Sequence, residues 1–315
     1  MAQKFPGLSN PAILSPMAGV TDVAFRALCK RYGAGMTCTE FVSSAALVRD
    51  SKRTWAMLVT DPNERPVGVQ LFGANEEEVV RAAQLVEKTF DVIDMNCGCP
   101  AWKVIKTGAG AALLNDAEKI GRLVERVVDA VKKPVTIKIR SGIDEHHLTA
   151  VQVAKAAEQA GAAAIAVHGR TQTQGYAGVA DWGVVKAVKD AVTIPVIGNG
   201  DVFTAKEFWE KKAASGCDYV MVARGAIGNP RIFRDIIAYN NGAAGPGRRN
   251  GTGVDIFLEY DALAQRYGVP FGQVKGHAIS FTRGMPGGSQ LRARLSKAGS
   301  AEELRRLVEN VPETI

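Results

Sequence analysis

This sequence of 315 residues has no long apolar run. No window reaches the roughly 18 consecutive apolar residues that a transmembrane helix needs. The opening segment MAQKFPGLSNPAIL also lacks the apolar stretch of a secretory signal peptide. We therefore expect a cytoplasmic protein. Low-complexity tracts are missing as well, and a composition of 46% hydrophobic and 23% charged residues is that of a compact globular chain.

Cysteine is scarce, with five residues in the chain. That number is too small for a disulfide framework, and a cytoplasmic protein keeps its thiols reduced. A cysteine with a special role would therefore be catalytic or bound to a metal. Cys29, Cys38 and Cys217 stand among apolar neighbours, where packing in the core is the expected role.

Acidic residues are absent from one long stretch, since none lies between Asp261 and Glu302. The whole chain has a formal net charge of +7, which suggests a polyanionic partner. The acid-free stretch carries these basic residues: Arg266, Lys275, Arg283, Arg292, Arg294 and Lys297. We interpret it as a candidate phosphate-binding face.

Short β-branched or apolar runs recur through the first two thirds of the chain, and a helix-length amphipathic segment follows each of them. Such alternation is typical of βα units in a parallel sheet. The runs are Ala12–Ser15, Met36–Glu40, Val67–Leu71, Val92–Asn96, Val135–Arg140, Ala163–His168, Pro195–Asn199 and Tyr219–Arg224. Eight units predict an α/β fold with a closed (βα)8 TIM barrel, and a doubly wound open sheet is the alternative.

Polar residues at the ends of these runs help to decide between the two folds. Seven runs have one at or beside the C-terminal end: Glu40, Gln70, Asn96, Lys138, His168, Asn199 and Arg224. Barrel enzymes assemble their active sites at this end of the strands. Side chains from seven strands converge on one mouth only if the sheet closes, so the sequence favours the barrel.

The segment NNGAAGPGRRNGTG after Tyr239 is rich in Gly and Asn and lacks periodicity, which is typical of a linker. We predict a catalytic barrel domain over residues 1–239, a linker over 240–253 and a small all-helical domain over 254–315. The expected helices of this last domain span residues 254–267, 271–283, 289–298 and 300–311. About 60 residues make only a marginal independent core, so these helices should dock on the barrel.

Two loops predict a phosphate site. Asn199-Gly200-Asp201 follows the seventh run, the segment ARGAIGNP over residues 223–230 follows the eighth, and both lead into helix N-termini. Phosphate sites of such barrels lie there, because exposed N–H groups and the helix dipole favour an anion. Arg224 can donate two parallel hydrogen bonds to a phosphate. If only one of these loops were present, we would interpret it as an ordinary tight turn between a strand and a helix.

Lys138 and His168 end the fifth and sixth runs. A buried lysine is rare without a partner, and a cation beside the pyrimidine edge of a flavin would stabilise the anionic reduced form. Each residue also has a structural interpretation, as a salt bridge at the mouth for Lys138 and as a hydrogen-bonded core histidine for His168.

The segment Asn96-Cys97-Gly98-Cys99-Pro100 directly follows the fourth run. Its Cys-x-Cys spacing is compatible with a zinc or iron–sulfur site, but no second cysteine pair or histidine cluster stands at ligand spacing, so we expect no metal. A thiol with an ordinary pKa of about 8.5 is mostly protonated at neutral pH and can deliver a proton to a carbanion. We therefore predict that Cys99 is an acid and that Cys97 packs away from the mouth.

The sequence resembles a known family, the tRNA-dihydrouridine synthases. The motifs that match in order and spacing are PMAGVTD (16–22), VQLFG (69–73), DMNCGCPAWKV (94–104), TIKIRSG (136–142), HGRT (168–171), GNGD (198–201) and ARGA (223–226). The most specific of them is the NxGCP motif, which is followed here by Lys103.

The resemblance implies an FMN-containing barrel with a helical C-terminal domain that reduces the C5–C6 double bond of uridine in tRNA, with NADPH as the reductant of the flavin. The residues that it assigns to FMN are Pro16, Met17, Ala18, Gln70, Lys138, His168, Asn199, Gly200, Asp201, Ala223 and Arg224. It assigns the target uracil to Asn96 and protonation of C5 to Cys99. Further substrate or RNA contacts that it implies are Lys103, Arg170, Lys275, His277 and Arg283.

Two other functions stay open at this stage. A small-molecule flavin barrel that acts on free uracil or dihydroorotate would share the FMN site, but it has no evident use for a basic helical appendage. An RNA-binding module with a purely structural flavin would have no need to combine Asn96, Cys99 and Lys138.

Overall fold

Eight parallel strands close into a barrel in the computed structural model, which describes residues 3–242, 253–285 and 287–310. The strands are β1 (Ala12–Leu14), β2 (Met36–Ser43), β3 (Val67–Phe72), β4 (Val92–Cys97), β5 (Val135–Arg140), β6 (Ala164–His168), β7 (Val196–Asn199) and β8 (Tyr219–Val222). They follow one another around the ring in sequence order, and β1 pairs with β8. The predicted barrel is confirmed, and the open sheet is excluded because it would leave β1 and β8 unpaired with each other.

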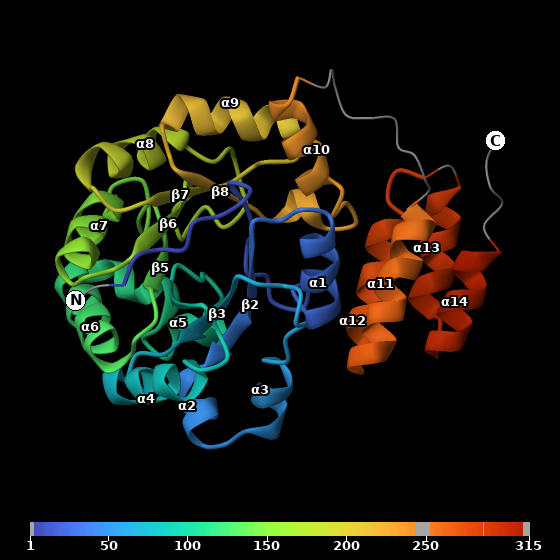
Figure 1. Ribbon diagram of the computed structural model, residues 1–315, viewed down its shortest axis with the longest axis horizontal. Helices are drawn as coiled ribbons and strands as arrows, with labels where there is room; N and C mark the ends of the chain where they lie inside the picture. Colours follow the sequence, from blue (N-terminus) through green and yellow to red (C-terminus); the bar gives the residue numbers. More distant parts are fainter. Residues whose placement is uncertain (1–2, 243–252, 286, 311–315) are drawn as a thin grey trace.

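The chain between and after the strands is mostly helical. The helices of this part are α1 (Val23–Arg31), α2 (Ser44–Val48), α3 (Lys52–Ala56), α4 (Glu76–Val86), α5 (Trp102–Ile105), α6 (Ala117–Ala130), α7 (Ala150–Gln159), α8 (Trp182–Ala191), α9 (Ala205–Ser215) and α10 (Ile232–Asn240), with 3₁₀ turns η1 (Gly110–Asn115) and η2 (Arg224–Ala226). Helices α4, α6, α7, α8 and α9 surround the sheet (Figure 1).

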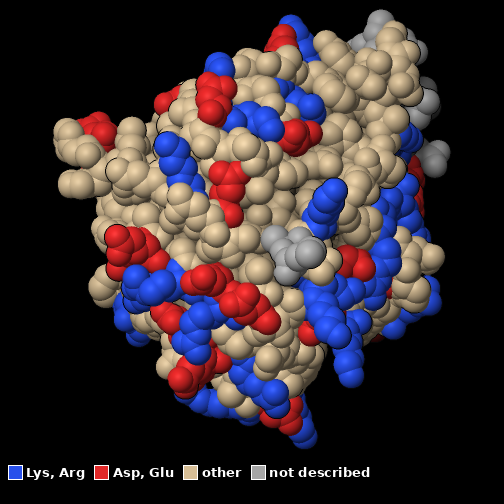
Figure 2. Space-filling view, turned by 60° about the vertical axis from the view of Figure 1, so that its left-hand side comes forward, with Lys and Arg blue, Asp and Glu red and all other residues tan. Residues whose placement is uncertain are grey.

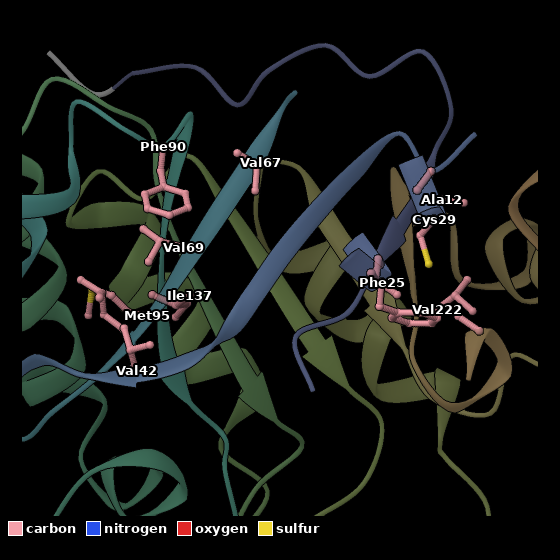
Figure 3. Close-up of a cluster of buried hydrophobic side chains, with 14 of the residues drawn as sticks. Ala12, Phe25, Cys29, Val42, Val67, Val69, Phe90, Met95, Ile137 and Val222 are labelled. Carbon is pink, nitrogen blue, oxygen red and sulfur yellow. The ribbon is translucent and has the colours of Figure 1, made fainter. Parts of the chain in front are cut away.

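The main core lies between the outer face of the sheet and the inner faces of the helices. Val69 and Ile137 on the strands are fully buried in it together with Phe25 of α1 and Phe90 (Figure 3). A second cluster fills the inside of the barrel with Ile13, Met36, Val92, Ala164, Ala166 and Met221 among others. Phe5 and Leu8 pack against this second cluster, so the barrel interior is filled with side chains rather than open.

Local signals set several of the helix ends. Thr204 and Glu207 form a capping box at the start of α9, with both reciprocal hydrogen bonds present. Helix α10 begins at Ile232, after a turn over residues 229–231 in which the Ile232 N–H donates to the Asn229 carbonyl.

Four helices follow in the C-terminal part and lie as a separate group beside α1 (Figure 1). They are α11 (Gly253–Tyr267), α12 (Phe271–Phe281), α13 (Gly288–Lys297) and α14 (Ala301–Glu309), close to the four expected ranges. Residues 243–252 of the expected linker over 240–253 lie outside the described residues.

These four helices dock on the barrel, as expected, and polar contacts tie them to it. The Tyr260 hydroxyl donates to the Asp22 carboxylate at 3.1 Å, and the Tyr267 hydroxyl donates to Asp61 at 2.6 Å. Asp22 also caps the N-terminus of α1, so the hydrogen bond from Tyr260 ties the bundle to the start of this helix.

Charge is distributed unevenly over the surface. On the face seen in Figure 2, acidic and basic side chains intermingle over the lower half, and Lys and Arg gather near the right-hand edge. In the part of the chain that the structure describes, no helix combines the length and the apolar character needed to cross a membrane.

Candidate active site

A cavity of about 450 Å³ opens at the C-terminal ends of the strands. Each of the eight βα units contributes to its wall, either through the strand itself or through the segment that follows it, from Ser15 after β1 to Ile227 after β8. Six of the seven polar residues noted at the strand ends line it: Gln70, Asn96, Lys138, His168, Asn199 and Arg224. The seventh, Glu40, lies under the wall, where it accepts hydrogen bonds from the Gly19 N–H at 2.6 Å and the Gln273 amide at 2.8 Å.

A chain of buried hydrogen bonds runs across the floor of this cavity. The Asp94 carboxylate accepts from the Thr136 hydroxyl and from the Gln70 amide, both at 2.6 Å. The Gln70 carbonyl then accepts from the Asn96 amide at 2.8 Å. Finally, the Asn96 carbonyl accepts from the Cys99 N–H at 2.9 Å. Because each group is held by the next, the network fixes both the amide of Asn96 and the loop that carries Cys99.

Burial governs the protonation of Asp94 and Cys99. It raises the pKa of Asp94, although the hydrogen bonds from Thr136 and Gln70 act in the opposite direction. It also raises the pKa of the half-buried Cys99 thiol, against a hydrogen bond from the Ala101 N–H and the charges of Arg140 and Lys138. Cys99 is therefore a neutral thiol at physiological pH, and it faces the cavity.

The other cysteine of the motif lies in the core. Cys97 is fully buried, and its neighbour Gly98 packs so closely on β5 that a Cβ there would be 3.0 Å from the Ile139 carbonyl carbon. A turn of small residues supports the Cys99 loop from behind, where the Ala111 N–H donates to the Cys99 carbonyl at 3.0 Å. Gly110 in this turn has a φ of +62° and could not carry a side chain without striking that carbonyl.

Lys138 and His168 lie side by side in the wall. The Lys138 ammonium donates to the Asn199 side chain at 3.0 Å, and loss of solvent together with the nearby Arg140 lowers the Lys138 pKa to about 8. Burial and the charges of Lys138, Arg140 and Arg170 lower the pKa of His168 to about 2. His168 is therefore neutral at physiological pH, and Lys138 is a cation that gives up its proton readily.

Asp201 joins the two loops in which a phosphate site is predicted. Its carboxylate accepts two hydrogen bonds from Arg170 at 2.8 Å and one from Arg224 at 2.7 Å. Burial raises the pKa of Asp201, but the bonds and charges of the two arginines outweigh this and lower it. At Gly200, φ is +131° and a Cβ would strike Ala180 and His168, so a glycine is required. Asp201 thereby orients Arg224 at the edge of the cavity.

The prediction of a direct substrate contact by Arg170 is wrong for this structure. Its side chain is 2% exposed and does not line the cavity. Besides Asp201, the guanidinium binds the carbonyls of Ala177 at 3.1 Å and Gly178 at 2.5 Å. Arg170 is thus a structural residue that holds the loop after β6 to the loop after β7.

The predicted RNA contact by His277 is also wrong. The residue is 3% exposed, because it stacks between Phe25 and Tyr260 with ring centroids 4.7 and 4.3 Å away. Its Nε2 lies 3.0 Å from the Val20 carbonyl and 3.2 Å from Asp22. His277 therefore joins the bundle to the loop after β1 that lines the cavity.

The remaining predicted RNA contacts are scattered. Lys103 is exposed on α5, beside the Cys99 loop, and Arg283 is exposed after α12. Lys275 is half-buried and donates to the Ala298 carbonyl at 2.8 Å. Of the three, only Lys103 is close in sequence to residues that line the cavity, since α5 directly follows the lining segment Gly98–Ala101.

Sequence reasoning missed Arg140 and Asp94. Arg140 lines the cavity, donates to the Gly98 carbonyl at 3.1 Å and binds the Thr171 carbonyl at 2.7 Å. Both residues follow the two-residue period of their strands, since Arg140 is two positions after Lys138 and Asp94 two positions before Asn96. This two-residue period could therefore have identified Arg140 and Asp94 as residues on the same face of their strands as Lys138 and Asn96.

Within the described ranges, 3–242, 253–285 and 287–310, no group of three or more His, Cys, Asp or Glu side chains is placed to hold a metal ion. The Cys97 and Cys99 side chains in particular belong to different environments, one in the core and one at the cavity.

Comparison with known proteins gives a consistent result. The family model described as dihydrouridine synthase (Dus) matches residues 13–315. The tRNA-dihydrouridine synthase B of Pseudomonas aeruginosa is 40% identical over 295 residues, which cover 92% of this chain and 89% of that protein. The probable tRNA-dihydrouridine synthase of Mycobacterium tuberculosis is 36% identical over 328 aligned positions, which cover 98% of this chain and 84% of that protein.

Proposed function

Since this chain belongs to the dihydrouridine synthase family, we propose that it reduces the C5–C6 double bond of uridine in tRNA to 5,6-dihydrouridine. The observation that carries the proposal is the placement of Cys99. A protonated thiol faces a cavity of about 450 Å³, beside an asparagine amide that a buried network holds in place. The chain is accordingly an oxidoreductase that works in the cytoplasm, where its tRNA substrate is found.

Asn96 and Cys99 have complementary roles in this proposal. A side-chain amide has two N–H donors, and Gln70 takes one of those of Asn96. The second can bind a carbonyl oxygen of the uracil ring and hold the ring flat in the cavity. Cys99 then gives its thiol proton to C5, which leaves a thiolate that takes up a proton again from solvent. The target base must leave its stack in the RNA to enter a cavity of this kind.

The residues around the cavity fit FMN. Lys138 offers a cation in the wall of the cavity, and Arg224, oriented by Asp201, offers a second at its edge, where a phosphate would sit near the loops after β7 and β8. The other predicted contacts are Pro16, Met17, Ala18, Gln70, His168, Asn199, Gly200 and Ala223, all of which line the same cavity. When bound, FMN supplies the hydride for C6 of uracil, and NADPH restores its reduced form.

We assign the two reactants to different parts of the chain. Residues 1–239 hold the flavin and the reacting base, whereas residues 254–315 contact the body of the tRNA. Support for the second assignment comes from the stretch between Asp261 and Glu302, which has basic residues and no acidic ones. Exposed Arg283 and Arg294 belong to it.

The test is a comparison of substrates. Purified protein supplied with FMN and NADPH should convert uridines of an unmodified tRNA transcript to dihydrouridine, seen by mass spectrometry of the digested RNA as the gain of two hydrogen atoms. Free uracil and dihydroorotate should react far more slowly, because they cannot use the basic helices. Faster turnover of either small molecule than of tRNA would favour the rival free-pyrimidine enzyme.

A pH titration tests the role of Lys138. Because its pKa is about 8, the residue loses its charge as the pH rises past that value, and the hydrogen bond that it would donate to the pyrimidine edge of the flavin weakens with it. We expect the affinity for FMN, measured by quenching of flavin fluorescence, to fall as the pH rises from 7 to about 9.

The control is Lys138→Met, which carries no charge at any pH. Its FMN affinity should be lower than that of the wild type at pH 7 and should change little up to pH 9. The groups that face Lys138 are Arg140, Asp94, Cys38, Cys99, His168 and Asn199. An equally steep pH dependence in the Met variant would assign the titration to one of them instead.

A further inference from the structure

Exposed aromatic side chains gather around the mouth of the cavity. The structure describes four aromatic residues with large exposed fractions: Trp102 at 74%, Tyr176 at 63%, Phe203 at 45% and Tyr239 at 37%. The first three belong to the connections after β4, β6 and β7. Tyr176 and Phe203 line the cavity, and Trp102 directly follows the lining residue Ala101. We call Trp102, Tyr176 and Phe203 the aromatic rim.

The two parts of the rim lie on different sides of the mouth. Trp102 follows β4, and Arg224, which follows β8, lies against the other two rings. In a closed ring of eight strands, β4 and β8 are opposite one another. Trp102 therefore belongs to the β4 side of the barrel mouth, and the Arg224 side chain with Tyr176 and Phe203 belongs to the opposite side.

Cations separate the rings of the rim. The Arg224 guanidinium lies 4.6 Å from the centroid of Tyr176 and 5.6 Å from that of Phe203. Lys103, also exposed, follows Trp102 in the sequence. A docking surface for another protein would join its apolar groups into one continuous patch. Rings interleaved with cations are instead the pattern that binds single-stranded nucleic acid, with bases on the rings and phosphates on the cations.

We propose that Trp102 and Tyr176 stack on the two nucleotides that flank the target uridine. This inference rests on the proposed function. When the uridine leaves the RNA stack, each neighbouring base loses one stacking partner, and an exposed ring at each side of the mouth replaces it. The rim thereby favours the RNA conformation in which the uridine is extruded, and it acts on any flanking base because every base has an aromatic face.

Three substitutions at Trp102 separate stacking from simple apolar contact. Trp102→Ala removes the ring, Trp102→Leu keeps an apolar side chain without an aromatic face, and Trp102→Phe keeps a smaller ring. We expect kcat/KM with tRNA to fall about tenfold or more in the Ala and Leu variants and to stay near the wild-type value in the Phe variant. We expect kcat/KM with tRNA to fall by a similar factor in Tyr176→Ala.

Tyr239→Ala, which removes an exposed ring from α10, is the matched control and should leave kcat/KM unchanged. The flavin absorbance should be the same in all these proteins. Wild-type kcat/KM in Trp102→Ala would overturn the inference, and so would a Leu variant as active as the wild type. If wild-type protein itself failed to modify tRNA, the proposed function would be overturned rather than the rim.

A binding measurement tests the rim without turnover. The chain has four tryptophans, and Trp102 is exposed. The difference in tryptophan fluorescence between the wild type and Trp102→Phe therefore reports on Trp102. A trinucleotide with a central uridine should quench this difference signal, whereas uridine monophosphate, which has no flanking bases, should not. Equal quenching by the two ligands, or by neither, would contradict stacking on a flanking nucleotide.

Discussion

Cys99→Ala should reduce the rate of dihydrouridine formation by about 10²- to 10⁴-fold, the usual contribution of a general acid. The physical reason is that burial keeps the thiol protonated at neutral pH, so that it is a proton donor as the protein stands. Alanine leaves C5 of the reduced uracil to take its proton from water, which has no fixed position in the cavity. The rate is measured as dihydrouridine formed per enzyme under saturating tRNA and NADPH.

The variant should keep its flavin, because Cys99 is not among the residues assigned to FMN. Its absorbance spectrum should therefore match that of the wild type. Cys97→Ala is the matched control, since Cys97 is two residues away and fully buried in the core. It should lose some stability and little activity. A Cys99→Ala protein with wild-type activity would exclude the thiol as the acid.

The strands of this fold could be predicted from the sequence almost to the residue. Parallel strands in a barrel are covered on both faces, so each one is a nearly continuous apolar run. The largest errors lie at the C-terminal ends, where strands pass into the site, whereas β6 and β7 each begin one residue later than predicted. β2 continues to Ser43 through a register shift between Cys38 and Phe41, and β8 ends at Val222 because Arg224 already belongs to η2.

The site could be predicted in part, and the missing part has a common cause. Residues that line the cavity follow strand ends, which a sequence reveals. The family resemblance assigned Arg170 and His277 to contacts with the substrate or the RNA, but both side chains are buried against partners from other segments, Arg170 against Asp201 and His277 against the loop after β1. His277 contacts the carbonyl of Val20, 257 residues away. Such pairings depend on how the bundle docks, which local sequence patterns do not encode.

Asp94 was missed for a related reason, because its hydrogen-bond partners also come from other parts of the sequence. A buried carboxylate is costly unless donors reach it, and its donors, Thr136 and Gln70, come from the two neighbouring strands. Only the register of β3, β4 and β5 reveals that the three side chains meet. The role that we propose for Asn96 depends on this register, because Gln70 links the amide to Asp94.

The second large effect should be on stability, at the ion pair between Arg26 of α1 and Glu64. Both side chains are fully buried, with the Arg26 Nε 3.1 Å from the Glu64 carboxylate. Arg26 also donates to the Thr21 carbonyl at 2.8 Å, so it supports the loop after β1. Glu64→Leu should lower the free energy of unfolding by about 3–5 kcal/mol, because it leaves a buried guanidinium without a counter-charge.

The double variant Arg26→Leu/Glu64→Leu should be less destabilised than Glu64→Leu, since it removes the uncompensated charge together with its partner. Urea unfolding followed by circular dichroism measures both. Asp190→Asn is the control, because Lys186–Asp190 has a similar separation of 2.8 Å but side chains that are 55% and 60% exposed. That variant should change stability by less than about 1 kcal/mol. If Glu64→Leu cost no more than Asp190→Asn, water would have to reach Arg26, and the buried pair would not anchor the start of α1 beneath the active site.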